Sequence, residues 1–164
     1  MLMPGKQSAP EVKALFLATL FLVAGIVVYV LDRGSSAHFL TAWSFGPAAP
    51  SILGPLGNHL PTLLHPPVFI LITAAILRPW PRTLPAICAA WFTIECLFEI
   101  GQMTPFDSRI AAAMSPWLDS APIVQITADY FTHGTFDLLD ILSIAIGTVV
   151  AYRLARRVFL QGEP

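Results

Sequence analysis

Charged residues are scarce in this sequence. Only 12% of the 164 residues are Asp, Glu, Lys or Arg, whereas a soluble domain usually carries about 25%. The nine basic residues nearly balance the ten acidic ones, and the formal net charge is -1. Nucleic-acid-binding domains carry a basic surface, so we expect no nucleic-acid partner.

Cysteine is equally scarce, with Cys88 and Cys96 in one apolar run. Eight helical residues separate them by about 12 Å, and a disulfide needs Cα atoms within roughly 7 Å. We therefore expect two free thiols. The sequence has no C-x-x-C and no H-E-x-x-H, and Ser143 and Thr148 have no histidine nearby in sequence. We predict no catalytic residue and no metal site, and enzymatic activity is the less favoured interpretation.

Apolar residues are abundant instead, at 55% of the chain with a mean hydropathy of +0.70. They gather in runs close to the length that an α-helix needs to cross a bilayer, about 20 residues. We predict an all-α integral membrane bundle of four transmembrane helices in a single domain, residues 1–164. The predicted spans are about 14–31, 60–77, 84–101 and 136–152.

The outer loops, 32–59 and 102–135, are expected to hold short helices at the membrane surface. In the second loop, Thr104 and Pro105 are typical of a helix start, and the helix would continue to Met114. Ser115-Pro116 could start another. In the second span, Pro66 and Pro67 follow His65, so the helix either begins at Pro66 or is kinked there.

The basic residues set the predicted orientation. Those at the ends expected to share one side with both termini are Lys6, Lys13, Arg78, Arg82, Arg153, Arg156 and Arg157. Those expected on the other side are Arg33 and Arg109. Because Lys and Arg favour the cytoplasmic side, we predict a multi-pass protein of the cell (inner) membrane with both termini in the cytoplasm.

Three spans then bring polar side chains to the outer half of the membrane. The predicted ligand-binding residues are His65 of the second span, Glu95, Glu99 and Gln102 of the third, and Asp137 and Asp140 of the fourth. An ionisable side chain within a membrane span normally faces protein or water. One interpretation is an outward-facing polar pocket for a cation, a lipid head group or a glycan-lipid group. The other is a set of interfacial residues and helix caps.

Glu95 is the deepest of the acids. It follows Arg82 by 13 residues, so it is expected roughly 10 Å below the outer edge of the hydrocarbon core. A carboxyl at that depth needs a partner, and His65 is the first candidate. In the fourth span, Asp140, Gly147 and Ala151 share one stripe, and its small residues favour close packing against another helix.

Four segments resemble one known family, the VanZ-like membrane proteins, named after a teicoplanin-resistance protein. The segments are Leu63–His65, Phe98–Gln102, Phe136–Leu142 and Gly147. The family carries a His at the start of one span, an E-x-x-Q at the end of another, and an R-x-F-x-x-x-D-x-x-x-N-x-x-G signature opening the last. Gly134 and Ile144 stand where that signature has Arg and Asn.

The resemblance implies a small protein of the cell envelope that acts on or binds an envelope lipid or a lipid-linked glycan. The alternative is an accessory or structural subunit of a larger membrane complex, which would use its apolar faces and long outer loop as contacts with other membrane subunits. In both cases the lipid bilayer is a partner. The sequence indicates no cofactor, and the cofactor stays unknown.

Overall fold

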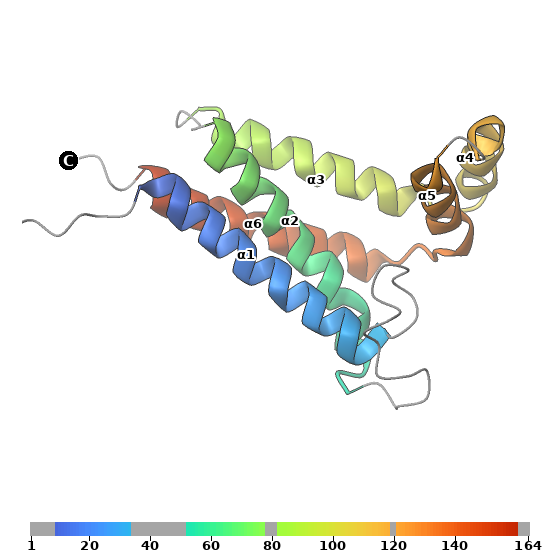
Figure 1. Ribbon diagram of the computed structural model, residues 1–164, viewed down its shortest axis with the longest axis horizontal. Coiled ribbons are helices and arrows are strands. Elements are labelled where there is room, and N and C mark those ends of the chain that lie inside the picture. Colours follow the sequence, from blue (N-terminus) through green and yellow to red (C-terminus); the bar gives the residue numbers. More distant parts are fainter. Residues whose placement is uncertain (1–8, 34–51, 78–81, 119–120, 161–164) are drawn as a thin grey trace, which may run out of the picture.

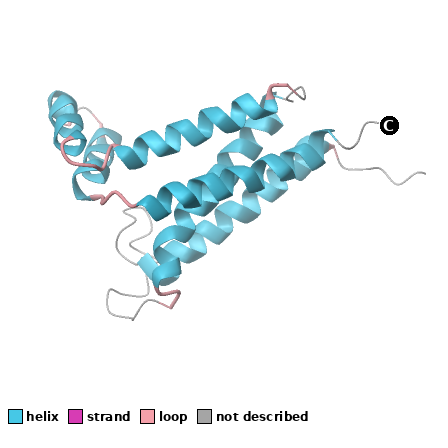
Figure 2. Ribbon diagram, turned by 180° about the vertical axis from the view of Figure 1, so that it is seen from behind, coloured by secondary structure: helices cyan, strands magenta, loops and turns pink. Residues whose placement is uncertain are grey.

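The computed structural model describes residues 9–33, 52–77, 82–118 and 121–160. Within these ranges the chain is helical and contains no strand (Figure 2). Most of the first outer loop, residues 34–51, lies outside the described residues. The expected all-α fold is confirmed for the part that is described.

Four long helices make up most of the described part of the chain: α1 (Pro10–Val28), α2 (Pro55–Leu77), α3 (Leu84–Ile100) and α6 (Leu138–Leu160). A single π-helical turn, η1 (Tyr29–Arg33), prolongs α1. Two shorter helices, α4 (Phe106–Met114) and α5 (Pro122–His133), follow α3, with a 3-10 turn, η4 (Ser115–Trp117), at the end of α4.

The long helices lie in two directions (Figure 1). The starts of α1 and α3 lie at the same end of the molecule as the ends of α2 and α6, so α2 and α6 run parallel to each other. α1, α2 and α6 pack together, and α3 contacts α2 and α6. α4 and α5 contact each other at the end of the molecule where α3 ends and α6 begins (Figure 1).

Three of these helices are long and apolar enough to cross a membrane: Pro10–Asp32, Pro55–Leu77 and Leu138–Phe159. α3 has only 17 residues, a rise of about 26 Å against a hydrocarbon core of roughly 30 Å. The structure thus supports a membrane-embedded helical protein with three helices of spanning length.

α2 begins at Pro55, five residues before the predicted span, so the predicted loop end at residue 59 is wrong. The start at Pro66 is also wrong, because Pro61, Pro66 and Pro67 all lie inside the helix. Gly54, at φ 56°, makes the turn that leads into it. Proline suits the first turn of a helix because its missing N–H has no partner there, and this explains the start at Pro55.

α6 runs to Leu160, eight residues beyond the predicted end of the span. Arg153, Arg156 and Arg157 therefore belong to its last turns, where cations are stabilised by the helix dipole. In the second outer loop, α4 is confirmed, but its N-cap is Pro105 and not Thr104. Only a 3-10 turn forms at Ser115, and α5 was not predicted.

Small residues bring α6 against α2. A Cβ built on Gly147 would lie 2.3 Å from the carbonyl oxygen of Leu63 and 3.2 Å from Cγ of Pro66. Pro67 stands four residues after Leu63, where a helical N–H would normally bond this carbonyl, but proline has no N–H. The backbone of Gly147, which carries no side chain, approaches the carbonyl there. Ala151 is fully buried one turn on. The predicted packing face of this helix is confirmed.

Candidate functional site

Glu99 ties the end of α3 to the beginning of α6. It is 5% exposed, and among the residues that the structure describes it is the charged residue that is buried. Its Oε1 accepts a hydrogen bond from the backbone N–H of Asp137 at 3.0 Å. Its Oε2 accepts one from Nε2 of Gln102 at 3.2 Å. A buried carboxylate is costly unless hydrogen-bonded, and both of its oxygens have a donor here.

Gln102 extends this network to α5. Its Nε2 also hydrogen-bonds the hydroxyl of Tyr130 at 2.7 Å, so one amide group bridges Glu99 and Tyr130. Gly134 permits the arrangement, since a Cβ there would lie 2.1 Å from Oε1 of Gln102 and 2.6 Å from the carbonyl oxygen of Tyr130. The glycine at position 134 thus lets the α5–α6 connection pass directly over the Gln102 side chain.

Asp137 caps α6. Its Oδ1 accepts the backbone N–H of Leu139 at 2.8 Å, and its carbonyl accepts the N–H groups of Asp140 and Ile141 at 3.1 and 3.4 Å. An aspartate in this position satisfies a free helix donor and favours the helix dipole. The side chain remains 45% exposed, so Asp137 can accept a hydrogen bond from a further partner.

His59 joins the two aspartates from α2. Its Nδ1 lies 2.9 Å from Oδ1 of Asp140, and its Nε2 lies 4.0 Å from Oδ2 of Asp137. His59 and Asp140 each precede the contact between Pro66 and Gly147 by the same number of residues, about two helical turns. The parallel packing of α2 and α6 therefore sets this pair in register.

The acidic cluster, as we name it here, is the set of side chains in these contacts: His59, Glu99, Gln102, Tyr130, Asp137 and Asp140. It holds four of the six predicted site residues. His59 and Tyr130 were missed. Pro55 is the sequence signal that could have identified His59. Proline is favoured at the first helical position, and a helix predicted to begin at Pro55 would have included His59. No sequence signal predicts Tyr130, since α5 itself was not expected.

His65 and Glu95 are not part of the acidic cluster. His65 is exposed, and its ring meets Phe69 edge-on with centroids 6.2 Å apart. Glu95 is partly exposed, but its Oε1 is buried without a hydrogen-bond partner among the described residues. The bond expected from His65 is therefore not made to this oxygen.

The cluster is acidic in balance. It contains three carboxyl groups and one histidine, and carboxylates can only accept hydrogen bonds when ionised. Partial burial of Tyr130, which stays 44% exposed, raises its pKa to about 12, with the Glu99 carboxylate adding to the rise. Tyr130 is thus neutral at physiological pH and keeps its hydroxyl as a donor and acceptor.

The arrangement does not resemble a metal centre. Among the residues that the structure describes, no group of three or more His, Cys, Asp or Glu side chains is placed to hold a metal ion. The exposed acceptors of Asp137 suit a hydroxyl or an ammonium group, because both donate hydrogen bonds to a carboxylate. The buried part of the acidic cluster, around Glu99, holds the exposed part, around Asp137, in position.

Comparison with known proteins adds no assignment: no family model, no curated protein and no solved structure matches this chain.

Proposed function

We propose that this chain is a VanZ-like membrane protein with four spans, α1, α2, α3 and α6, whose acidic cluster faces the outside and binds the head group of an envelope lipid or a lipid-linked glycan. The observation that carries the proposal is the bonding of Glu99. This buried carboxylate receives Asp137 N–H from α6 and Gln102 from its own helix. The bonds fix a partly exposed group of acceptors at one end of the helices.

The orientation follows from the charge at the two ends. Among the described side chains, the end that holds the start of α1 and the end of α6 carries Lys13, Arg82, Arg153, Arg156 and Arg157. The acidic cluster lies at the opposite end, where α3 ends and α6 begins. Under the positive-inside rule the basic end is cytoplasmic, and the cluster then opens to the outside.

The charge also indicates which part of a head group binds. Like charges close together repel, and phosphate oxygens facing Asp137 and Asp140 would be disfavoured. Sugar hydroxyls and amino groups donate hydrogen bonds to these carboxylates instead. We therefore propose a ligand that presents hydroxyl or amino groups, with any phosphate kept away from the acids.

The VanZ-like resemblance agrees with this grouping. The E-x-x-Q of Glu99 and Gln102 and the acids of Asp137 and Asp140 are far apart in sequence, yet they belong to one hydrogen-bonded network. The ring of the family histidine, His65, meets Phe69 edge-on. His59 takes the place beside the acids.

The test is to identify the lipids that copurify with the protein after mild detergent extraction, by native mass spectrometry. Asp140→Asn removes the charge beside His59 and is expected to reduce the bound glycolipid or aminolipid several-fold. Asp129→Asn, on α5 and outside the cluster, is the matched control and should retain it. Equal lipid retention by both variants would refute the proposal. Stoichiometric copurification with a large complex, together with equal retention, would support the accessory subunit instead.

A further inference from the structure

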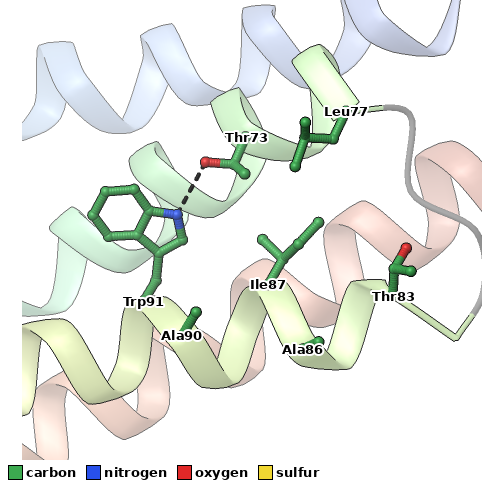
Figure 3. A pocket seen from close by; sticks show the side chains of 7 residues that line it. All are labelled: Thr73, Leu77, Thr83, Ala86, Ile87, Ala90 and Trp91. Atoms are coloured by element: carbon green, nitrogen blue, oxygen red, sulfur yellow. Dashed lines mark hydrogen bonds between the residues drawn. The ribbon is translucent and has the colours of Figure 1, made fainter.

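A groove lies between the second half of α2 and the first half of α3 (Figure 3). Its volume is about 450 Å³, within the range of roughly 300–1,000 Å³ that is typical of small-molecule sites. Thr73 and Leu77 line it from α2, and Ala86, Ala90 and Trp91 line it from α3. The groove lies toward the end of the helices opposite to the acidic cluster, as the course of α2 and α3 in Figure 1 shows.

Two polar side chains of the mostly apolar lining bond each other. Nε1 of Trp91 donates to Oγ1 of Thr73 at 3.0 Å, the bond drawn in Figure 3. The Trp91 indole also stacks on Phe69, with ring centroids 4.6 Å apart. These two contacts fix the indole at one end of the groove. The small side chains of Ala86 and Ala90 leave the space along α3 unfilled.

The other end of the groove is next in sequence to a positively charged residue. Arg82 comes directly before Thr83, which also lines the groove. Arg82 is exposed and forms no salt bridge with any residue in the described part of the chain. From Leu84 to Trp91 the helix rises about 10 Å. The apolar groove therefore runs along the helix to Thr83, and the exposed Arg82 is the residue directly before Thr83 in the chain.

We propose that this groove binds an anionic phospholipid, with one acyl chain between α2 and α3 and the phosphate at Arg82. The charge complementarity selects the lipid: anionic head groups gather at basic residues on the cytoplasmic side of a membrane. A polar peptide would leave its backbone groups unbonded against the apolar lining. The inference rests on the proposed orientation but not on any ligand at the acidic cluster, which lies at the opposite end.

The experiment measures quenching of Trp91 fluorescence by brominated lipids. Trp43, Trp80 and Trp117 are replaced by Phe, and the protein is placed in vesicles of phosphatidylcholine. The vesicles also contain a small fraction of one brominated lipid, either phosphatidylglycerol or phosphatidylcholine, with the bromine on its acyl chains. We expect brominated phosphatidylglycerol to associate about fivefold more strongly, the factor that one arginine near an anionic membrane surface gives.

Two pairs of variants locate the effect. Arg82→Gln should abolish the preference for phosphatidylglycerol, whereas Arg153→Gln, the same change on α6, should preserve it. Ala90→Leu should fill the groove and reduce quenching by both lipids. Ala89→Leu, on the neighbouring residue outside the lining, should leave quenching unchanged and shows that a larger side chain on α3 is tolerated.

Two results would overturn the proposal. Equal quenching by both lipids that is insensitive to Arg82→Gln means that Trp91 faces bulk lipid. No quenching by either lipid means that protein, such as a second copy, covers the groove. The lipid preference of Trp91 is measured separately from copurification at the acidic cluster, so either proposal can fail alone.

Discussion

The backbone N–H of Asp137 donates a hydrogen bond to the carboxylate of Glu99 at 3.0 Å, joining the N-terminus of α6 to the end of α3. The two residues are 38 positions apart in sequence, and α4 and α5 lie between them. This bond makes the acidic cluster one unit, because Glu99 also holds Gln102 while Asp137 lies beside His59.

Glu99→Ala should destabilise the protein by about 1–3 kcal/mol, the cost of leaving a buried donor without its acceptor. It removes the acceptor of both the Asp137 N–H and the Gln102 amide. Thermal unfolding in detergent measures the effect. Gln125→Ala, at an exposed position of α5, serves as the control and should change little. Equal melting temperatures for the two variants would show that this bond does not hold the helix ends.

His59 and Asp140 should be coupled energetically. We expect His59→Gln and Asp140→Asn to give a coupling energy of about 0.5–3 kcal/mol in a double-mutant cycle, as residues in direct contact do. The physical reason is the 2.9 Å contact between Nδ1 and Oδ1. Strictly additive effects on unfolding would mean that the two side chains do not interact.

Gly147→Ala should destabilise the bundle by about 1–3 kcal/mol, because an added methyl group in a packed contact forces the backbone to shift. The methyl group would meet the Leu63 carbonyl oxygen at 2.3 Å, and that backbone atom has little freedom to yield. Gly25→Ala in α1 is the matched control, since a Cβ there has nothing within 4 Å. Because Ala favours a helix more than Gly does, a loss of stability at both sites alike would point to general strain and not to the α2–α6 contact.

The phenol of Tyr130 should lose its proton at a higher pH than an ordinary tyrosine does. Its pKa is raised to about 12 by partial burial and by the Glu99 carboxylate, so the folded state holds the phenol proton more tightly than the unfolded state. Its stabilising contribution is complete below pH about 10, the ordinary pKa of tyrosine, and is lost as the pH rises toward 12. Tyrosinate absorbance, read as wild type minus Tyr130→Phe, measures this. A midpoint near 10 would contradict the described environment of the hydroxyl.

Much of the helical framework could be predicted from the sequence. α3 occupies nearly the predicted residues, because Arg82-Thr83 precedes a run that is apolar apart from Glu95, Glu99 and Thr93, and Gly101 follows it. The role of Gly147 was also predictable, since small residues on a helix stripe favour close packing. Both predictions depend only on a short stretch of sequence. The structure adds which neighbouring helix each segment contacts.

The turn and break signals in the sequence did not predict that His59 belongs to the acidic cluster. Gly54-Pro55 and Gly57-Asn58 are typical of turns and placed the predicted helix start at about residue 60, past His59, while Pro66 and Pro67 offered a still later start. Prolines are tolerated in an apolar helix where neighbouring helices compensate for the lost bonds, and that depends on tertiary packing. Tyr130 reaches Gln102 only through the folding of α5, which a window of sequence does not specify.

The central claim is that the acidic cluster faces the outside, and thiol labelling in intact cells tests it most directly. Cys88 and Cys96 are first replaced by Ala, and a single cysteine is then placed at Ser108 in α4 or at Thr83 before α3. Both positions are exposed. The account predicts that an impermeant maleimide labels the cysteine at 108 in intact cells and the cysteine at 83 only after the cells are opened. Labelling of position 83 from outside, with position 108 protected, would contradict it.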